Sequence, residues 1–351
     1  MATLLDAPAT RPDEDLESRL ESEADSSETP PSTRPLNQSD RIAQTVVLAL
    51  LFAGPALMCL RGSSANDADI WWHIRTGEWI LQHHAVPHVD AFSAPFAGQP
   101  WLAYSWLFEV IVAKLFLLRG LVGVATYSAA MIFAITVAMY HLVRRLQPDF
   151  TLSVLLTFAA MFSMGHMFTP RPWLFTILFF ALELNILMHA RGTGKLRELL
   201  WLPVIFALWS NVHIQFVNGL FVLGLATVEA VAAHWWTATQ TRVRPIWLCA
   251  TLLGSLLATL VNPYGWHIYA VAHDLATQAG ALDKITELQS IPFRSLSDYV
   301  VLLLALGSAA ALASRRRLVF FESALLIFAA VLSFRSQRDV WVIVVAGAAI
   351  L

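Results

Sequence analysis

Long apolar runs follow one another along most of the chain. A bilayer core of about 30 Å is crossed by roughly 20 apolar residues in a helix, and these runs reach or approach that length. We predict transmembrane helices at 42–61, 121–143, 151–168, 172–190, 199–211, 216–235, 245–262, 297–314, 318–334 and 339–351. The pattern therefore predicts an all-α polytopic membrane protein, a bundle of about ten transmembrane helices.

Three segments depart from this pattern. Residues 1–40 are rich in Asp, Glu, Ser, Thr and Pro, which predicts a disordered acidic tail, and the run at 42–61 is then a retained signal anchor. The stretch 103–119 carries Glu109 and Lys114 in a run that is short for a crossing, so we predict an amphipathic helix in the membrane interface. The last run is still apolar at Leu351, and we expect the natural protein to continue beyond it.

Basic residues give the orientation, because Lys and Arg in short loops stay on the cytoplasmic side. They gather after every second predicted helix, at Arg144–Arg145, at Arg191, Lys195 and Arg197, at Arg242 and Arg244, and at Arg315–Arg317. All four groups can be cytoplasmic together if the tail 1–40 is cytoplasmic and the loop 62–120 is outside. The polar junctions NDADIWWH, TPRPW, SNVHIQ, VNPYGWH and FRSQRD then share the outer face, where they can converge on one site.

Composition supports the membrane class and excludes others. Hydrophobic residues make up 57% of the chain and charged residues 14%, and the mean hydropathy is +0.60. The formal net charge of −2 offers no basic surface for nucleic acid. Cys59 and Cys249 lie within apolar runs, so we expect packing residues and neither a disulfide nor a zinc site.

A second surface helix is predicted in the first outer loop. Over 69–82 the residues Ile70, Ile74, Leu81, Trp72 and Trp79 fall on one apolar face. Arg75, Glu78 and Gln82 form the opposite polar face, and Trp71, Trp72 and Trp79 are expected to anchor the helix at the membrane surface.

Asp67 and Asp69 lie at the start of this helix. One interpretation is that Asp69 only caps the helix, a contribution of about 1 kcal/mol. The other is that the pair supplies a general base or a metal-binding carboxylate at the membrane surface. Further along the loop, Asp90 either braces the turns around it or contacts substrate. His83, His84 and His88 have no matching Cys or His cluster, so metal binding by them is not expected.

The other outer junctions carry three arginines and a histidine. Arg171, between two prolines, and the pair Arg335 and Arg338 present guanidinium groups that can bind phosphate oxygens bidentately. Alternatively, each simply reaches lipid headgroups at a helix end. His213, near Asn211, can hydrogen-bond a substrate or satisfy neighbouring backbone.

These junctions together resemble the GT-C superfamily of membrane glycosyltransferases. The resemblance covers roughly 41–351 and rests on the acidic pair Asp67-Ala-Asp69 followed by Ile-Trp-Trp-His73, the surface helices after it, and the helix that ends in Arg144–Arg145. It implies a GT-C-like bundle, Asp69 or Asp67 as the base that activates the acceptor, and His73, Asp90 and His213 at the substrate. The outer arginines would hold the lipid phosphate.

The resemblance also implies the partners. The donor would be a polyprenyl-phosphate-linked sugar, the acceptor a glycan, lipid or protein, and the place the outer face of a bacterial inner membrane. No particular cofactor is implied, and the need for a divalent cation is left open. The chain has no WWDYG-like motif and no soluble C-terminal domain, so the subfamily, mannosyltransferase-like or arabinosyltransferase-like, stays open.

Two other functions remain. A transporter or flippase of lipid-linked substrates would also be polytopic, but its usual repeated halves with interrupted helices at the midplane are not visible here. A non-catalytic subunit with the same fold predicts that changing Asp67 and Asp69 alters no glycan.

Overall fold

The computed structural model describes residues 37–61, 67–232, 241–277, 284–315 and 319–351. In these residues the backbone is helical, with one isolated antiparallel bridge between Val89 and Pro100 and no strand. The α-helices are α2 (Gln38–Arg61), α3 (Ile70–His83), α4 (Trp106–Arg119), α5 (Leu121–Leu146), α6 (Phe150–Ser163), α7 (Trp173–Thr193), α8 (Trp201–Val212), α9 (Phe216–Ala232), α10 (Pro245–Ala258), α11 (His267–Thr277), α13 (Leu296–Ala313), α14 (Phe320–Arg335) and α15 (Val340–Ile350). Short 3₁₀ turns add η1 (Gly165–Met167), η2 (Arg197–Leu200), η3 (Thr286–Leu288) and η4 (Gln337–Asp339).

Cα packing divides the chain into two units, 1–47 and 48–351. In the first unit the described part is the start of α2. There Asn37 Oδ1 accepts hydrogen bonds from Asp40 N at 2.7 Å and from Ser39 Oγ at 2.8 Å, so the helix begins at Gln38. The predicted tail extends to about residue 40, whereas the helix already begins at Gln38. Residues 1–36 of the tail lie outside the described residues.

Four described helices are long and apolar enough to cross a membrane. They are Gln38–Leu60, Leu121–Leu146, Trp173–Thr193 and Leu296–Ala313. The other predicted spans coincide with helices of 11 to 17 residues, of which α15 is the shortest and α9 the longest. At about 1.5 Å per residue these helices are shorter than a bilayer core.

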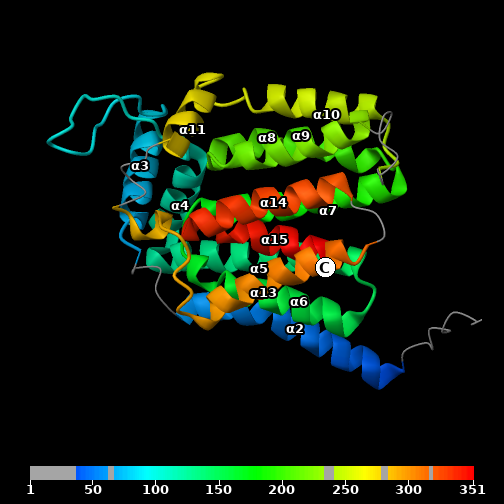
Figure 1. Cartoon of the computed structure of the whole chain (residues 1–351). Helices are drawn as coiled ribbons and strands as arrows, with labels where there is room; N and C mark the ends of the chain where they lie inside the picture. Colours follow the sequence, from blue (N-terminus) through cyan, green and yellow to red (C-terminus); the bar gives the residue numbers. More distant parts are fainter. Residues whose placement is uncertain (1–36, 62–66, 233–240, 278–283, 316–318) are drawn as a thin grey trace, which may run out of the picture. The chain divides into compact units, whose positions relative to one another are not determined.

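The junctions sort into two groups, as alternating helix directions require. Polar junctions contact one another: Asn211 Nδ2 donates to Val261 O at 2.7 Å, and Gln215 Nε2 donates to Asp339 Oδ1 at 2.5 Å. Basic junctions do the same, since Arg242 N donates to Arg191 O at 2.8 Å. In Figure 1, α3 and α4 lie at the end of the helical bundle opposite the turn between α7 and α8.

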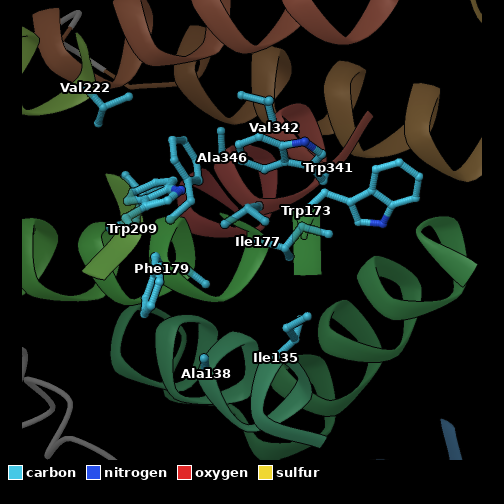
Figure 2. Close-up of a cluster of buried hydrophobic side chains, with 14 of the residues drawn as sticks. Ile135, Ala138, Trp173, Ile177, Phe179, Trp209, Val222, Trp341, Val342 and Ala346 are labelled. Atoms are coloured by element: carbon cyan, nitrogen blue, oxygen red, sulfur yellow. The ribbon is translucent and has the colours of Figure 1, made fainter. Parts of the chain in front are cut away.

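The core of the second unit is built around α15. Every residue from Val340 to Ile350 is buried, because this helix is apolar on all sides. Trp341 meets the Phe180 ring edge to face at 5.1 Å, and Trp209 stacks on Phe206 at 5.6 Å. Figure 2 shows Trp341, Trp209, Ile177 and Ile135 in this cluster, contributed by α15, α8, α7 and α5.

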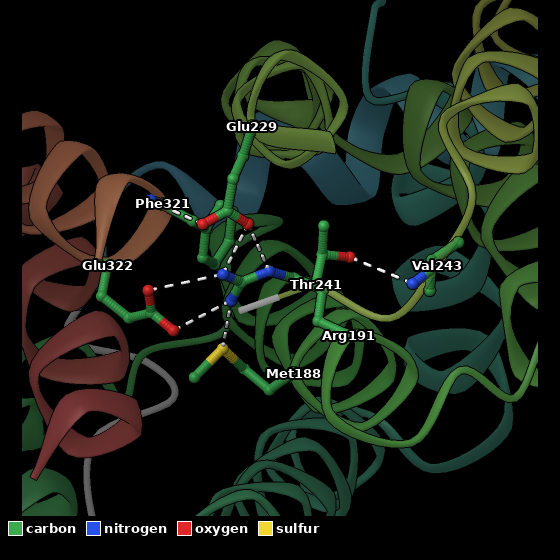
Figure 3. Close-up of polar contacts among 7 residues, drawn as sticks. All are labelled: Met188, Arg191, Glu229, Thr241, Val243, Phe321 and Glu322. Atoms are coloured by element: carbon green, nitrogen blue, oxygen red, sulfur yellow. Dashed lines mark hydrogen bonds and ion pairs between the residues drawn. The ribbon is translucent and has the colours of Figure 1, made fainter. Parts of the chain in front are cut away.

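A buried ion cluster joins α7, α9 and α14 (Figure 3). Arg191 donates through Nη2 to Glu229 Oε2 at 2.6 Å and through Nη1 to Glu322 Oε1 at 3.0 Å. Its guanidinium also lies 4.1 Å from the centre of the Phe321 ring. Three helices are therefore held in register at the end of the bundle that carries the basic junctions.

The helix α3 packs on α4 along one face. The buried residues are Ile70, Ile74, Thr76, Gly77 and Ile80. Of the predicted apolar face, Ile70 and Ile74 are buried, while Trp79 and Leu81 are partly buried. Gly77 lies against the backbone of Glu109, which lets the two helices approach closely. Trp71 and Trp72 remain about half exposed, at 46% and 48%.

Candidate functional site

The acidic pair is held by one arginine. Arg171 Nε donates to Asp67 Oδ2 at 2.5 Å, and Arg171 Nη1 donates to Asp69 Oδ2. The Asp67 side chain is buried, while that of Asp69 is 54% exposed. The two neighbouring prolines restrict the backbone around Arg171, and Tyr127 Oη donates to its carbonyl oxygen at 3.2 Å.

Asp69 does not act as a helix cap. It occupies the residue before α3, but its side chain accepts no hydrogen bond from the first turn. The backbone amide of Asp69 instead donates to Asp67 Oδ1 at 3.1 Å. The capping interpretation is therefore wrong, and the Asp69 carboxylate faces Arg171.

A cavity of about 460 Å³ lies beside this cluster, within the roughly 300–1,000 Å³ usual for small-molecule sites. Residues from α3, the start of α4, the start of α7, and the η3 and η4 turns line it. They are Asp69, Trp72, His73, Thr76, Trp101, Leu102, Tyr104, Ser105, Glu109, Arg171, Pro172, Ile285, Glu287 and Arg338. Segments far apart in the sequence thus converge here. Three of the five predicted polar junctions, NDADIWWH, TPRPW and FRSQRD, contribute residues to the lining, and SNVHIQ and VNPYGWH contribute none.

The two arginines that line the cavity both pack against the ring of Trp173. The guanidinium carbons of Arg171 and Arg338 lie 5.3 Å and 5.4 Å from its ring centre, within range of a cation–π interaction. Arg338 is 3.9 Å from Glu287, and its buried Nε has no hydrogen-bond partner among the described residues. Arg171 is neutralised by two aspartates, so Arg338 is the better placed of the two to receive an anion.

His73 and Glu109 form a second polar pair in the cavity. His73 Nδ1 lies 3.2 Å from Glu109 Oε1, and the His73 ring packs edge-on against Phe108. Burial raises the pKa of Glu109, and the hydrogen bond with His73 only partly opposes this effect. The lining beside this pair also carries the aromatic side chains of Trp72, Trp101 and Tyr104.

Sequence reasoning missed Glu109 as a site residue. It treated the carboxylate as a mark of an interfacial helix, and α4 does form over most of the predicted range. The available signal was spacing: Ser105 and Glu109 are four residues apart and can share one helical face.

Four predicted site residues lie outside the cavity lining. One of them, Asp67, is bonded to Arg171 beside the cavity. Asp90 braces its own loop, where Oδ1 accepts from Phe92 N at 2.7 Å and from Ser93 N at 3.0 Å. Arg335 is exposed at the end of α14. His213 is fully buried, and its Nδ1 lies 2.7 Å from Thr176 Oγ1.

His213 serves the protein interior in this structure. Thr176 Oγ1 also accepts from Trp209 Nε1 at 2.8 Å, so the three side chains form a chain of hydrogen bonds between α7 and α8. Burial lowers the pKa of His213 well below its usual range, which keeps the ring neutral.

A divalent cation does not fit the acidic pair, because Arg171 bonds to both carboxylates. Across the described part of the chain, no group of three His, Cys, Asp or Glu side chains is arranged to hold a metal ion. His83 stacks on Trp79 at 4.1 Å, and its Nδ1 lies 2.9 Å from the Trp79 carbonyl oxygen.

No protein-family model, curated protein or solved structure matches this chain.

Proposed function

We propose that this chain is a membrane glycosyltransferase with a GT-C-like bundle of about ten helices, the shorter of them completing the four of spanning length. It transfers a sugar from a polyprenyl-phosphate donor to a glycan, lipid or protein acceptor on the outer face of a bacterial inner membrane. The observation that carries the proposal is the cavity that joins Asp69, His73, Arg171 and Arg338. A carboxylate, an imidazole and guanidinium groups are the parts that such a transfer needs.

The proposed reaction assigns roles to Asp69 and to the two arginines. Asp69, half exposed and lining the cavity, takes the proton of the acceptor hydroxyl as its oxygen attacks the anomeric carbon. The bond from that carbon to the phosphate oxygen breaks, and its electron pair leaves with the polyprenyl phosphate. Arg338 stabilises the charge that develops on the leaving phosphate. A single displacement of this kind inverts the anomeric configuration.

Arg171 is assigned a positioning role. Its bonds to Asp67 and Asp69 fix the carboxylate of Asp69 at the cavity edge and balance the negative charge there. A donor phosphate can then approach Arg338 without meeting two unpaired carboxylates.

The test replaces Asp69 with Asn and follows sugar transfer from polyprenyl-phosphate-linked donors in isolated membranes. We expect transfer to fall about 10²- to 10⁴-fold, the usual contribution of a general base. Asp274→Asn, an exposed aspartate on α11, is the matched control and should leave transfer unchanged. If Asp69→Asn transfers sugar as fast as this control at equal protein levels, Asp69 is not the base.

A further inference from the structure

Unpartnered polar atoms gather on one wall of the cavity. Trp101 Nε1, Ser105 Oγ and Glu109 Oε2 are all buried, and none has a hydrogen-bond partner in the described part of the chain. All three residues line the cavity. Most buried polar atoms in proteins are hydrogen-bonded, so three unsatisfied ones in the same lining indicate that a ligand completes them.

Backbone hydrogen bonds fix the residues that carry these atoms. Glu109 N donates to Ser105 O at 3.0 Å, which puts the two side chains on successive turns at the start of α4. Trp101 is fixed in front of them, because its amide donates to His88 O at 2.9 Å and its ring packs against Phe92. The wall is therefore preorganised, and a ligand would not have to order it.

The chemistry of the wall favours an uncharged ligand with several hydroxyl groups. The indole N–H only donates, the serine hydroxyl donates and accepts, and the glutamate oxygen accepts. Hydroxyl groups can satisfy each of them, whereas an anion would be opposed by Glu109. Trp72 and Tyr104 add aromatic surface on which the apolar face of a ring can lie.

Charge divides the cavity into two parts. Glu109 lies on α4 with its other oxygen bonded to His73, while Arg338 comes from η4 and lies beside Trp173. A phosphate is attracted to Arg338 and a neutral ring to the wall of α4. A ligand with a phosphate at one end and a hydroxylated ring at the other matches both.

We infer that Trp101, Ser105 and Glu109 form a subsite for a neutral sugar ring, with Glu109 accepting a hydrogen bond from one ring hydroxyl and Trp101 donating one to another. This subsite rests on the proposed function, because it names the part of the same cavity that holds the transferred sugar. It assigns residues that the sequence analysis did not connect with substrate.

The test measures binding of free D-mannose, D-arabinose and D-glucuronate to the purified full chain in a sugar-free detergent by saturation-transfer NMR. We expect the first two sugars to bind and glucuronate not to, because its carboxylate meets Glu109. Glu109→Gln should weaken binding of the neutral sugars about tenfold or more, since it replaces a charged acceptor with a neutral amide. Trp101→Phe keeps an aromatic ring but loses the indole N–H, and it should weaken binding about three- to tenfold.

Matched controls separate the subsite from general damage. Glu78→Gln removes a carboxylate that pairs with Arg75 on the outer surface of α3, and Trp71→Phe changes a half-exposed indole that packs on Phe116. Both variants should bind sugar like the unchanged protein. Failure of the unchanged protein to bind either neutral sugar, equal binding by Glu109→Gln and Glu78→Gln, or binding of glucuronate as tight as that of mannose would overturn the subsite.

The outcome also distinguishes the subsite from the proposed function. Asp69→Asn should keep sugar binding although it loses transfer. Sugar binding that depends on Glu109 in a protein with no transferase activity would refute the transferase and leave the subsite. Transfer that depends on Asp69 but not on Glu109 or Trp101 would refute the subsite and leave the transferase.

Discussion

The contact between α3 and α4 can be tested at Gly77. An ideal Cβ atom placed on this residue would lie 2.0 Å from the carbonyl oxygen of Glu109 and 2.5 Å from its carbonyl carbon. Both are backbone atoms, so no side chain can swing aside. In the variant Gly77→Ala the two helices must separate by about 1 Å or more, because packed interiors leave no spare room.

The magnitude follows from two opposing effects. Alanine is better than glycine inside a helix by about 1 kcal/mol. Overpacking a close contact costs about 1–3 kcal/mol, and more where backbone must move. Because the clash is with backbone, the cost should lie at the upper end of this range. We therefore expect Gly77→Ala to lower the free energy of unfolding by on the order of 2 kcal/mol, about 3 kcal/mol less the gain of about 1 kcal/mol.

The separation should also disturb the cavity. His73 on α3 and Glu109 on α4 are 3.2 Å apart, and a shift of about 1 Å exceeds the reach of a hydrogen bond. Thermal unfolding of the purified protein and sugar binding by NMR measure the two effects. Gly224→Ala on α9 is the matched control, since its added Cβ meets nothing within 4 Å and should be neutral or stabilising. If Gly77→Ala is as stable as Gly224→Ala and binds sugar equally, the close approach of the helices is incorrect.

Two further predictions concern buried and bridging charges. Arg191→Met leaves the carboxylates of Glu229 and Glu322 buried without their partner, and should lower stability by about 3–5 kcal/mol in thermal unfolding. Arg75→Met at an exposed pair should cost about 0–1 kcal/mol, and equal losses in the two variants would contradict this account. Hydrogen bonds from Ser93 lower the pKa of the Asp90 carboxyl group in the folded protein. The ionised carboxylate therefore stabilises the loop fully above the unfolded pKa of about 4, and this stabilisation is lost as the pH falls through the lower pKa of the folded protein. Hydrogen exchange of the loop, corrected for the intrinsic rate, should show this loss of protection on acidification, and Asp90→Ala should abolish the pH dependence.

Much of the helical framework was predictable from local pattern. The interval 121–143 contains most of α5, 172–190 most of α7, and the predicted surface helix after Asp69 agrees with α3. Apolar runs and their polar ends fix such helices because the backbone must satisfy its own hydrogen bonds wherever water is excluded. The same pattern did not give all helix lengths: α6 ends at Ser163 and α10 at Ala258, short of the predicted ends at 168 and 262.

The site divides in the same way. Sequence alone selected Asp69, Arg171 and Arg338, because charged residues at the ends of apolar runs are few and the alternation of basic turns places these on one face. It could not decide that Arg171 would neutralise Asp67 and Asp69, that His213 would turn into the interior, or that Glu109 would enter the cavity. These outcomes depend on how closely α3 approaches α4 and on how η4 meets the start of α7. Such distances are set by packing between distant segments, and a local pattern of residues carries no information about them.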